Sequence, residues 1–445
     1  MNNSKHTVFQ SRQTIVKKQT ENMGVTLDMV FSRHPVYSRL VQELGFTRKD
    51  FETVGDLSLL PVTTKSDFIS RPEEYRLDST GLAPEEVAVW DVMHTTGTTT
   101  GQPAPFYSTA YDLYKILSIQ EGMMQLRGVG SDNLIANLFP LTVWPHGAYA
   151  RVSDAAAAIK VPVINVLPGN PSRFFEHGSG MEEAIGLIEQ NRATILWGVP
   201  SYVRRLLIEA ADLGADFSAV RFLFITGESA PEALRADLKA RLSTLGASEA
   251  VISISYGATE MQGGMVECQS DSGFHNPAPD QFHTDIVDPE THQTIPKGER
   301  GLVLISHLDR RGTVLLRYSM GDISALASGP CPHCGSETER LTETPVRSDS
   351  LIKIKGTLVN PAIIEEILLN EPGVREFQIV IERLNPEDPF SPDHLRLRIA
   401  GHEADIVQRV KEAVGVTPGV EIAEPEEVFA AGNTLKSRRV VDTRK

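Results

Sequence analysis

The densest group of hydrogen-bonding side chains occupies residues 94–103, with the sequence His-Thr-Thr-Gly-Thr-Thr-Thr-Gly-Gln-Pro. Five threonines and two glycines fill residues 95–101. A turn of this composition offers closely spaced hydroxyl and backbone N–H donors, and its glycines let a ligand approach the main chain, as the binding of a phosphate chain requires. No Gly-Lys-Ser/Thr follows at the spacing of a Walker A loop. On these residues alone, a flexible polar turn is an equally good explanation.

The three cysteines of the chain form a second chemical pattern. Cys268 is followed by His275, and Cys331 and Cys334 flank a Pro-His pair. Three thiolates and one imidazole complete a tetrahedral set for zinc and leave no open position, so the spacing predicts a structural zinc site. Unrelated buried thiols and a surface histidine are the alternative, and His333 could replace His275 only with awkward geometry. Because three cysteines cannot all pair, a disulfide framework is not expected, and a cytoplasmic location is predicted.

The elements that position these residues follow from hydrophobic patterning. Short apolar runs that predict strands are found at residues 87–92, 134–139, 161–167, 194–199, 220–226 and 251–255. Amphipathic segments at residues 181–191 and 201–213 between them predict helices. The alternation predicts an α/β fold with helix-covered, mostly parallel sheets, whose ligands gather at the carboxyl ends of the strands. The run at residues 87–92 predicts a buried strand directly before the threonine segment.

Further polar motifs stand where predicted strands end. Residues 224–231 read Phe-Ile-Thr-Gly-Glu-Ser-Ala-Pro and predict a helix from Pro231, so Glu228 can act simply as a carboxylate at the amino terminus of that helix. Residues 255–260 read Ser-Tyr-Gly-Ala-Thr-Glu, and residues 317–322 read Arg-Tyr-Ser-Met-Gly-Asp. For Glu260 the alternative to a site role is a solvated carboxylate in a turn.

Taken in order, these motifs resemble those of the adenylate-forming enzymes, the acyl-CoA synthetase superfamily. The threonine segment resembles the phosphate loop Thr/Ser-Ser-Gly-Thr-Thr-Gly-x-Pro with Thr100 inserted, and residues 256–260 match Tyr-Gly-x-Thr-Glu. Residues 345–356 resemble the hinge motif, with Val346 and Ser350 in place of a glycine and an aspartate. Two more segments, residues 60–65 and 359–365, look like the phenylacetate/benzoate-CoA ligase branch.

The resemblance implies a role for each matched residue. Thr259 would touch the α-phosphate, and Glu260 would hold Mg²⁺, which takes few protein oxygens and shares the rest with phosphate and water. Lys436 matches the catalytic lysine although Leu435 replaces a glycine; taken alone, it would be part of a solvated basic tail. The implied ATP-binding residues are Thr95, Thr96, Gly97, Thr98, Thr99, Thr100, Gly101, Gly227, Glu228, Tyr256, Gly257, Asp322 and Arg347.

The same resemblance implies an aromatic carboxylic acid as substrate. The residues expected to line its pocket are Phe139, Trp144, His146, Gly147, Gly227, Tyr256 and Ala258. Trp144 and His146 would suit a hydroxyl or amino substituent on the ring, although each can equally be a core residue.

The implied organisation is a large amino-terminal domain, residues 1–347, and a small mobile α+β lid, residues 348–445, that turns about Asp349. Within the lid, strands are predicted at residues 377–381 and 395–399, and a helix at residues 404–414. The implied reaction is ATP-dependent formation of an acyl-AMP followed by transfer of the acyl group to coenzyme A. Open alternatives are transfer to a carrier protein or an amine, activation of another oxyanion, and a non-catalytic nucleotide-binding relative.

Composition argues against two classes of partner, nucleic acids and membranes. The chain has 445 residues and a formal net charge of −15, which argues against a general nucleic-acid binder. No apolar run approaches the roughly 18 residues that span a bilayer, and no secretory signal is recognised at the amino terminus, so no membrane partner is expected. A homodimer is compatible with the sequence.

Overall fold

The computed structural model describes residues 6–95, 103–142, 146–169, 178–347, 351–388, 390–401, 405–430 and 437–444. It divides into two compact units whose segments alternate along the chain. The first unit takes residues 1–133, 143–162 and 253–348, and the second takes residues 134–142, 163–252 and 349–445. A domain boundary between residues 347 and 348 stays a prediction.

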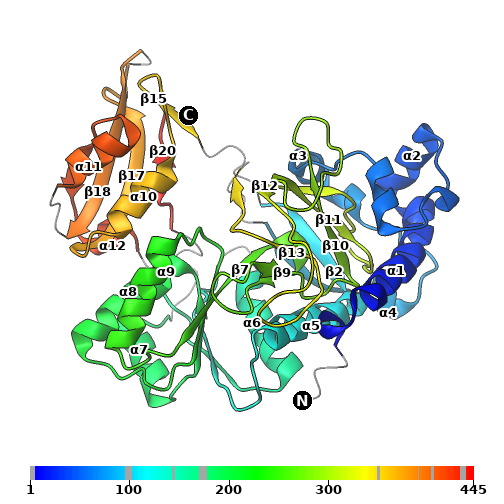
Figure 1. Cartoon of the computed structure of the whole chain (residues 1–445), viewed down its shortest axis with the longest axis horizontal. Helices are drawn as coiled ribbons and strands as arrows, with labels where there is room; N and C mark the ends of the chain where they lie inside the picture. Colours follow the sequence, from blue (N-terminus) through cyan, green and yellow to red (C-terminus); the bar gives the residue numbers. More distant parts are fainter. Residues whose placement is uncertain are drawn as a thin grey trace. The chain divides into compact units, whose positions relative to one another are not determined.

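The helices of the first unit precede or cover its sheets (Figure 1). They are α1 (Arg12–Arg33), α2 (Pro35–Leu44), α3 (Lys65–Ser70), α4 (Pro84–Val87), α5 (Ala110–Leu126) and α6 (Gly147–Ile159). His34 explains the sharp break between the first two, because its Nδ1 accepts hydrogen bonds from the backbone N–H groups of Val36 and Tyr37 and so caps α2. Pro35 at the first position of α2 adds a preset φ angle.

The described strands of the first unit are antiparallel to their neighbours within that unit. One sheet has the order β10-β11-β12-β14, and a second series has the order β13-β9-β8-β7. The strands are β7 (Val251–Ala258), β8 (Gly263–Val266), β9 (Phe274–His275), β10 (Phe282–Val287), β11 (Gly301–His307), β12 (Tyr318–Ser324), β13 (Arg340–Leu341) and β14 (Val346–Arg347).

The predicted buried strand at residues 87–92 is wrong in two respects. Residues 84–87 form α4, and the strand that follows, β1 (Val89–His94), pairs with β2 (Pro105–Thr109) in an antiparallel hairpin outside the parallel sheet. Val89 is 46% exposed and Trp90 57% exposed. An apolar run therefore marks the strand here, but it does not distinguish a buried strand from the outer strand of a hairpin.

Parallel strands occur in the second unit, in the order β6-β5-β3-β4. They are β3 (Ile135–Asn137), β4 (Val163–Asn165), β5 (Ile195–Gly198) and β6 (Phe222–Thr226), and their helices are α7 (Met181–Gln190), α8 (Pro200–Leu213) and α9 (Glu232–Thr244). These strands and helices confirm the alternation predicted from the apolar runs. β5 is buried at all four positions, as expected for a strand covered on both faces.

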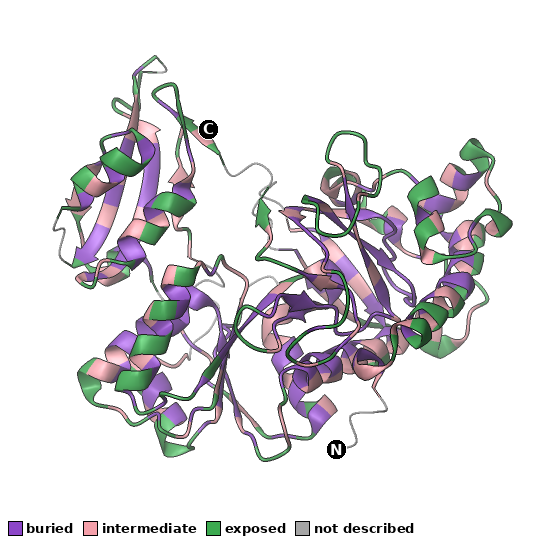
Figure 2. Cartoon of the chain, in the orientation of Figure 1, coloured by how far each residue is buried: buried purple, intermediate pink, exposed green. Residues whose placement is uncertain are grey.

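The end of the chain contributes a four-stranded sheet of order β19-β18-β17-β20 to the second unit. The elements are β15 (Ile352–Ile354), β16 (Thr357–Val359), α10 (Pro361–Leu369), β17 (Val374–Arg383), β18 (Asp393–Gly401), α11 (Ile406–Val414), β19 (Gly419–Ile422), α12 (Pro425–Val428) and β20 (Val440–Asp442). Helices α10 and α11 lie side by side on this sheet (Figure 1). Figure 2 shows buried strands beneath helices whose outer sides are exposed.

The α/β fold class is confirmed, with a large portion of mixed sheets and a small carboxy-terminal sheet. The second unit contains the parallel pairs β3–β4, β3–β5, β5–β6, β17–β20 and β18–β19. Among the residues that the structure describes, no helix combines the length and the apolar character needed to cross a membrane.

Candidate functional site

Three predicted ATP-binding residues meet at one corner of the first unit. The hydroxyl of Tyr256, on β7, donates a hydrogen bond to Oδ2 of Asp322, on β12, at 2.8 Å. Nε of Arg347 lies 3.3 Å from Oδ1 of the same carboxylate. Asp322 and Arg347 are direct partners in the β12–β14 pairing, which explains why the two side chains meet. We call Tyr256, Asp322, Arg347, Glu260 and Tyr318 the nucleotide corner, after the role that the motifs predict for them.

Glycines on β12 and β7 provide backbone conformations and close strand contacts next to the residues of this corner. Gly321, next to Asp322, has a φ of +75°, a conformation that favours glycine. Gly257 on β7 opposes Gly264 on β8, and a Cβ atom at Gly257 would lie 2.3 Å from the carbonyl oxygen of Gly263. The glycine predicted at this position is therefore required by the close approach of the two strands.

Glu260, the predicted Mg²⁺ ligand, lies in a short 3₁₀ helix, Thr259–Met261, that follows β7. Its side chain is buried, and Oε1 accepts a 2.7 Å hydrogen bond from the hydroxyl of Tyr318. Its backbone oxygen lies 2.9 Å from Nε2 of His307. Burial and the adjacent carboxylates raise the pKa values of Tyr256 and Tyr318, so both phenols stay protonated donors. The two acidic side chains are thus held in place by protein groups.

Thr259 and His146 converge on the backbone carbonyl of His94, the last residue of β1. The Oγ1 of Thr259 donates to this oxygen at 3.2 Å, and Nδ1 of His146 lies 3.0 Å from it. The hydroxyl oxygen of Thr95, the first threonine of the segment, accepts a hydrogen bond from the N–H of Ala104 at 3.0 Å. Burial, followed by the charge of His146, lowers the pKa of His94. Thr259 and His146 therefore both contact the end of β1, at the residue before Thr95.

Other predicted site residues lie outside the described residues. They are Thr96, Gly97, Thr98, Thr99, Thr100, Gly101, Trp144, Asp349 and Lys436.

Glu228, in the second unit, contacts a different helix from the one expected. Its Oε2 accepts the backbone N–H of Ser201 at 2.9 Å, and its Oε1 accepts the hydroxyl of Ser201 at 2.8 Å. It therefore caps α8, which begins at Pro200, and not the helix that follows Glu228 in sequence. Its Oε1 also accepts the N–H of Ser437 at 2.5 Å. Glu228 thereby joins α8 to the residue that follows Lys436 in sequence.

The remaining residues predicted to line the acyl pocket are divided between the units. His146, Gly147, Tyr256 and Ala258 belong to the first unit, where Gly147 is the first residue of α6. Phe139 and Gly227 belong to the second. Phe139 is buried, and Gly227 has a φ of +93° at the end of β6.

Sequence reasoning missed the roles of Tyr318 and Ser201. Tyr318 is part of the Tyr-Ser-Met-Gly-Asp motif, so its motif position was an available signal for a site residue. Ser201, as the partner of Glu228, carried no such signal, because nothing in its local sequence distinguishes it from an ordinary residue of the first turn of a helix.

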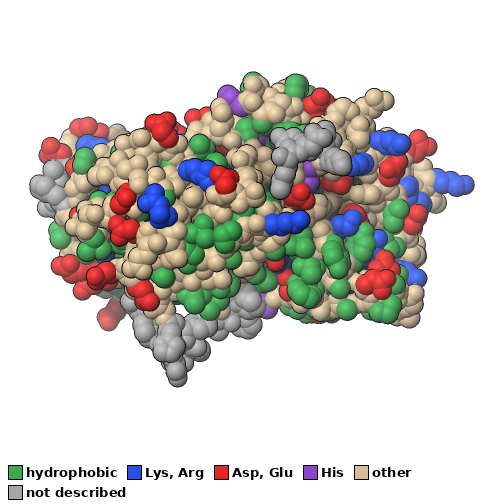
Figure 3. All heavy atoms as spheres, turned by 90° about the horizontal axis from the view of Figure 1, so that it is seen from below, with side chains coloured by type: hydrophobic (Ala, Val, Ile, Leu, Met, Phe, Trp, Pro, Cys, Tyr) green, Lys and Arg blue, Asp and Glu red, His purple; other side chains and the backbone are tan. Residues whose placement is uncertain are grey.

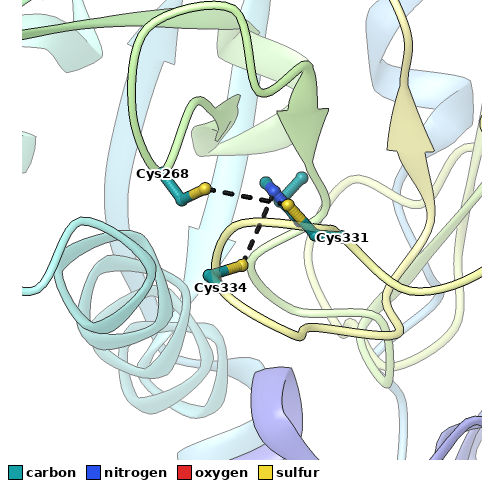
Figure 4. A group of neighbouring side chains, drawn as sticks. Cys268, Cys331 and Cys334 are labelled. Atoms are coloured by element: carbon teal, nitrogen blue, oxygen red, sulfur yellow. Dashed lines mark hydrogen bonds between the residues drawn. The ribbon is translucent and has the colours of Figure 1, made fainter.

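The four predicted zinc ligands come together in the first unit. Cys268 follows β8, His275 ends β9, and Cys331 and Cys334 come from one loop; Figure 4 shows the three sulfur atoms turned toward one another. All four donor atoms lie within 4.8 Å of one another. The Sγ atoms of Cys268 and Cys331 are 3.9 Å apart, and Sγ of Cys334 lies 3.8 Å from Nε2 of His275.

This geometry fits a tetrahedral ion. Bonds of about 2.3 Å to sulfur and about 2.0 Å to nitrogen place tetrahedral donors roughly 3.5–3.8 Å apart, close to the separations found here. A hydrogen bond with Cys334 and the proximity of His275 lower the pKa of Cys268, which favours the thiolate that metals bind. His333 is not part of the set, because its Nδ1 lies 2.7 Å from the side-chain nitrogen of Gln269. We call Cys268, His275, Cys331 and Cys334 the Cys/His cluster.

The Tyr256–Asp322 and Tyr318–Glu260 contacts thus bring two of the predicted motifs together. The chain belongs to the AMP-binding enzyme family, whose model matches residues 78–308. The adenylate-forming resemblance drawn from the motifs is thereby confirmed, and the chain is an AMP-forming enzyme by family.

Individual relatives are distant but cover almost the whole chain. The chain is 26% identical to a phenylacetate-coenzyme A ligase of Thermus thermophilus over 98% of both proteins. It is 24% identical to a phenylacetate-coenzyme A ligase of Escherichia coli K12 over 84% of this chain and 80% of that protein. Among solved structures, a 2-hydroxyisobutyryl-CoA ligase in the postadenylation state, in complex with R3-HIB-AMP, has a TM-score of 0.79 at 20% identity and covers 98% of this chain and 91% of its own. That likeness establishes the shared fold.

Proposed function

We propose that the protein is an ATP-dependent aryl-CoA ligase, which activates an aromatic carboxylic acid as acyl-AMP and transfers the acyl group to coenzyme A. The observation that carries this proposal is the nucleotide corner, where two separate motifs contact each other twice, through Tyr256 with Asp322 and through Tyr318 with Glu260. The name shared by the relatives from Thermus thermophilus and Escherichia coli supports an aromatic acid and coenzyme A as the other substrates.

In the first half-reaction, a carboxylate oxygen of the acid attacks the α-phosphorus of MgATP, and pyrophosphate leaves with the electron pair of the broken P–O bond. Asp322 accepts the ribose hydroxyls, and Tyr256 fixes the orientation of that carboxylate. Glu260 would offer an oxygen to Mg²⁺, and the threonine segment would donate to phosphate oxygens. Thr259, whose hydroxyl donates to the His94 carbonyl, would lie against the α-phosphate. Lys436 supplies a positive charge at the reacting oxygens. Catalysis consists of positioning and charge stabilisation.

In the second half-reaction, the sulfur of coenzyme A attacks the acyl carbon, AMP leaves, and the thiol proton passes to solvent. The proposal assigns this step to a different pose of the carboxy-terminal residues, reached by rotation about Asp349. Lys436 is then withdrawn, since its charge is needed only while phosphate oxygens react.

The acid is proposed to be aromatic, with His146 and Trp144 beside a polar ring substituent. Nδ1 of His146 lies 3.0 Å from the carbonyl oxygen of His94, at the end of β1. This contact supports a position of His146 next to the reacting carboxylate. Phe139, Gly147, Gly227 and Ala258 complete the proposed lining. The solved relative binds the adenylate of an aliphatic hydroxy acid, so the substrate test includes that class.

The Cys/His cluster is proposed to hold one structural zinc ion. Four protein donors fill a tetrahedral shell, so the ion would take no part in the chemistry. It would join the segment after β8 to the loop after β12, two strands that lead away from Glu260 and Asp322. The gathering of all three cysteines at a metal-type cluster also supports the reducing cytoplasm as the location.

Partners are proposed to be small molecules, with a carrier protein as the alternative thiol donor and a homodimer as the alternative to a monomer. On the face drawn in Figure 3, basic side chains of the described residues lie singly among acidic and apolar ones. Together with a net charge of −15, this supports the absence of a nucleic-acid partner.

A substrate panel tests the function. Phenylacetate, benzoate, hydroxybenzoates, anthranilate and 2-hydroxyisobutyrate are each incubated with ATP and Mg²⁺, with and without coenzyme A, and AMP and thioester are measured by mass spectrometry. The expected result is an aryl-CoA thioester with stoichiometric AMP. AMP formation only when a carrier protein or an amine is added would reject the coenzyme A assignment, and thioester only from 2-hydroxyisobutyrate would reject the aromatic one.

A further inference from the structure

A buried arginine on α6 contacts both segments that carry the adenylation motifs. Arg151 has a side chain that is 8% exposed, and its Nη2 lies 2.8 Å from Oδ2 of Asp91 on β1. The same nitrogen also donates to the side-chain oxygen of Gln262, which directly follows the Thr259–Met261 turn. Its Nη1 donates to Asp154, one turn further along α6, at 2.6 Å.

The contacts of Arg151 belong to a closed ring of hydrogen bonds. Gln262 donates from Nε2 to the backbone oxygen of Thr259 at 2.7 Å. Thr259 in turn donates from Oγ1 to the carbonyl of His94 at 3.2 Å, and His94 lies on β1, three residues after Asp91. The ring therefore runs from β1 through Arg151, Gln262 and Thr259 and back to β1.

Gln262 is held firmly within this ring. It has a φ of +55°, which is uncommon for a residue with a side chain, and its backbone oxygen accepts a 3.1 Å hydrogen bond from Nε2 of Gln120 on α5. A residue kept in the left-handed region by several contacts is typical of a segment whose position matters for function.

We infer that Arg151 is a positioning residue for acyl-AMP formation, because it fixes the β1–β2 hairpin relative to the turn that carries Thr259 and Glu260. This inference rests on the proposed function. The planar guanidinium contacts Asp91 and Gln262 through Nη2 while its Nη1 contacts Asp154, and a lysine has no second nitrogen with which to reproduce this three-acceptor arrangement. Misplacing a phosphate-binding segment by about 1 Å can cost on the order of 10²-fold in rate.

A purely structural arginine would have different consequences. Removing it would lower the stability of the fold and both half-reactions in parallel. A positioning role predicts that the loss is confined to the half-reaction in which the α-phosphate reacts, because the attack of coenzyme A on a preformed acyl-AMP does not need the pyrophosphate-binding segments.

The test compares Arg151→Lys with Gln262→Asn and with the control Asp154→Asn. Gln262→Asn opens the ring while keeping the buried charge, and asparagine tolerates a positive φ. Asp154→Asn alters the one Arg151 contact that lies outside the ring. Acid-dependent exchange of pyrophosphate into ATP, the apparent KM for MgATP, thioester formation from supplied acyl-AMP, and the unfolding temperature are measured for each.

The expected result for Arg151→Lys and Gln262→Asn is a drop of roughly 10- to 100-fold in exchange, with thioester formation from supplied acyl-AMP within about twofold of the native rate. Asp154→Asn should stay within about twofold in both reactions. Equal losses in the two half-reactions, or unchanged exchange in both ring variants, would overturn the inference and leave the proposed function intact. Absence of exchange in the native chain would instead reject the proposed function, and this inference with it.

Discussion

The nucleotide corner and the Cys/His cluster both lie in the first unit, but their polar groups are satisfied in different ways. In the corner, Asp322 has Tyr256 and Arg347 as partners, and Glu260 has Tyr318. In the cluster, thiol sulfurs approach each other and an imidazole, as in the 3.9 Å contact of Cys268 with Cys331. Side chains that hydrogen-bond to one another keep their positions without a ligand. Three thiols and an imidazole, in contrast, gain a strong common partner only when a metal ion binds.

The two regions should therefore differ in how far their folding depends on a ligand. The corner should be formed before MgATP arrives, so its variants should lose chemistry more than stability. The cluster should contribute folding free energy through the metal, so its variants should lose stability first. Each of the following experiments separates chemistry from folding in one of the two regions.

The largest effect on a reaction rate is expected from the loss of Lys436, the cation proposed to act at the reacting oxygens. Lys436→Ala should lower acyl-AMP formation on the order of 10²–10³-fold or more, by analogy with the loss of one preorganised donor. Thioester formation from supplied acyl-AMP and coenzyme A should stay close to the native rate, and the unfolding temperature should be unchanged. Both half-reactions are followed by mass spectrometry, and an equal loss in the two would assign Lys436 a structural or coenzyme A-side role.

The next largest effect is expected in the cluster. Protein purified without added metal should contain about one equivalent of zinc per chain, and Cys331→Ser should lose it together with on the order of 5–10 °C in unfolding temperature. The loop that carries Cys331 also holds the amino terminus, since the Ser336 hydroxyl donates to the carbonyl of Val8 at 2.7 Å and Glu337 accepts the N–H of Arg12 at 2.7 Å. Zinc content and the unfolding temperature by calorimetry are measured for the native protein, for Cys331→Ser and for a second variant, Cys331→Ala. A metal-free native protein of the same stability as both variants would contradict the zinc proposal.

A smaller effect is expected when a single donor is removed from the corner. Tyr256→Phe deletes the 2.8 Å hydrogen bond to Asp322 and leaves the ring in place. The apparent KM for ATP should rise by several-fold to about tenfold, as expected for the loss of one hydrogen bond of about 1 kcal/mol that orients the carboxylate without contacting ATP itself. Tyr318→Phe is the matched variant at Glu260, and it should change the Mg²⁺ dependence instead. Identical kinetic changes in the two variants would mean that the tyrosines do not serve separate carboxylates.

The smallest effect concerns pH. Burial, with the charge of Arg310 as a second cause, lowers the pKa of His307 from 6.5 to about 3. Its Nδ1 accepts the N–H of Leu315 at 3.0 Å, and its Nε2 lies 2.9 Å from the carbonyl of Glu260, so the neutral ring is the form that fits. Between pH 3 and 6.5 the unfolded chain binds more protons than the folded one. The stabilisation is therefore fully present above pH 6.5 and is lost as the pH falls toward 3.

Urea unfolding at several pH values between 7.5 and 5 measures this effect, with His307→Gln as the comparison because an amide can donate and accept without titrating. The native protein should lose stability more steeply than the variant as the pH falls. Equal slopes would mean that His307 does not contribute. The second buried histidine, His34, whose pKa burial lowers to about 4, is present in both proteins and cancels from the difference.

How much the sequence could predict differs between these regions for physical reasons. The Cys/His cluster follows from ligand chemistry and spacing, since few other functions bring three cysteines and a histidine together. The parallel strands of the second unit follow from apolar runs separated by amphipathic helices. Residues 87–92 were wrongly predicted to be buried, because hydrophobicity alone does not identify the outer strand of a hairpin.

Long-range partners account for what the sequence did not predict. Tyr256 and Asp322 are separated by 66 positions, and only the order of family motifs suggested that they belong to one site. The capping of α8 by Glu228 has no local signal, because the partner Ser201 lies 27 residues earlier and the helix that follows Glu228 offers an equally reasonable amino terminus. The ring through Arg151 depends on three segments whose pairing is a property of the tertiary fold.

The most direct test of the account is acid-dependent exchange of pyrophosphate into ATP by the native chain and by Glu260→Gln. The substitution keeps an oxygen that can accept the Tyr318 hydroxyl, so the fold of the corner should survive while one negative charge for Mg²⁺ is removed. In the native protein we expect exchange that requires an aromatic acid, and in the variant a loss on the order of 10²-fold or more at an unchanged unfolding temperature. Exchange at the native rate in Glu260→Gln would show that the nucleotide corner is not where MgATP reacts.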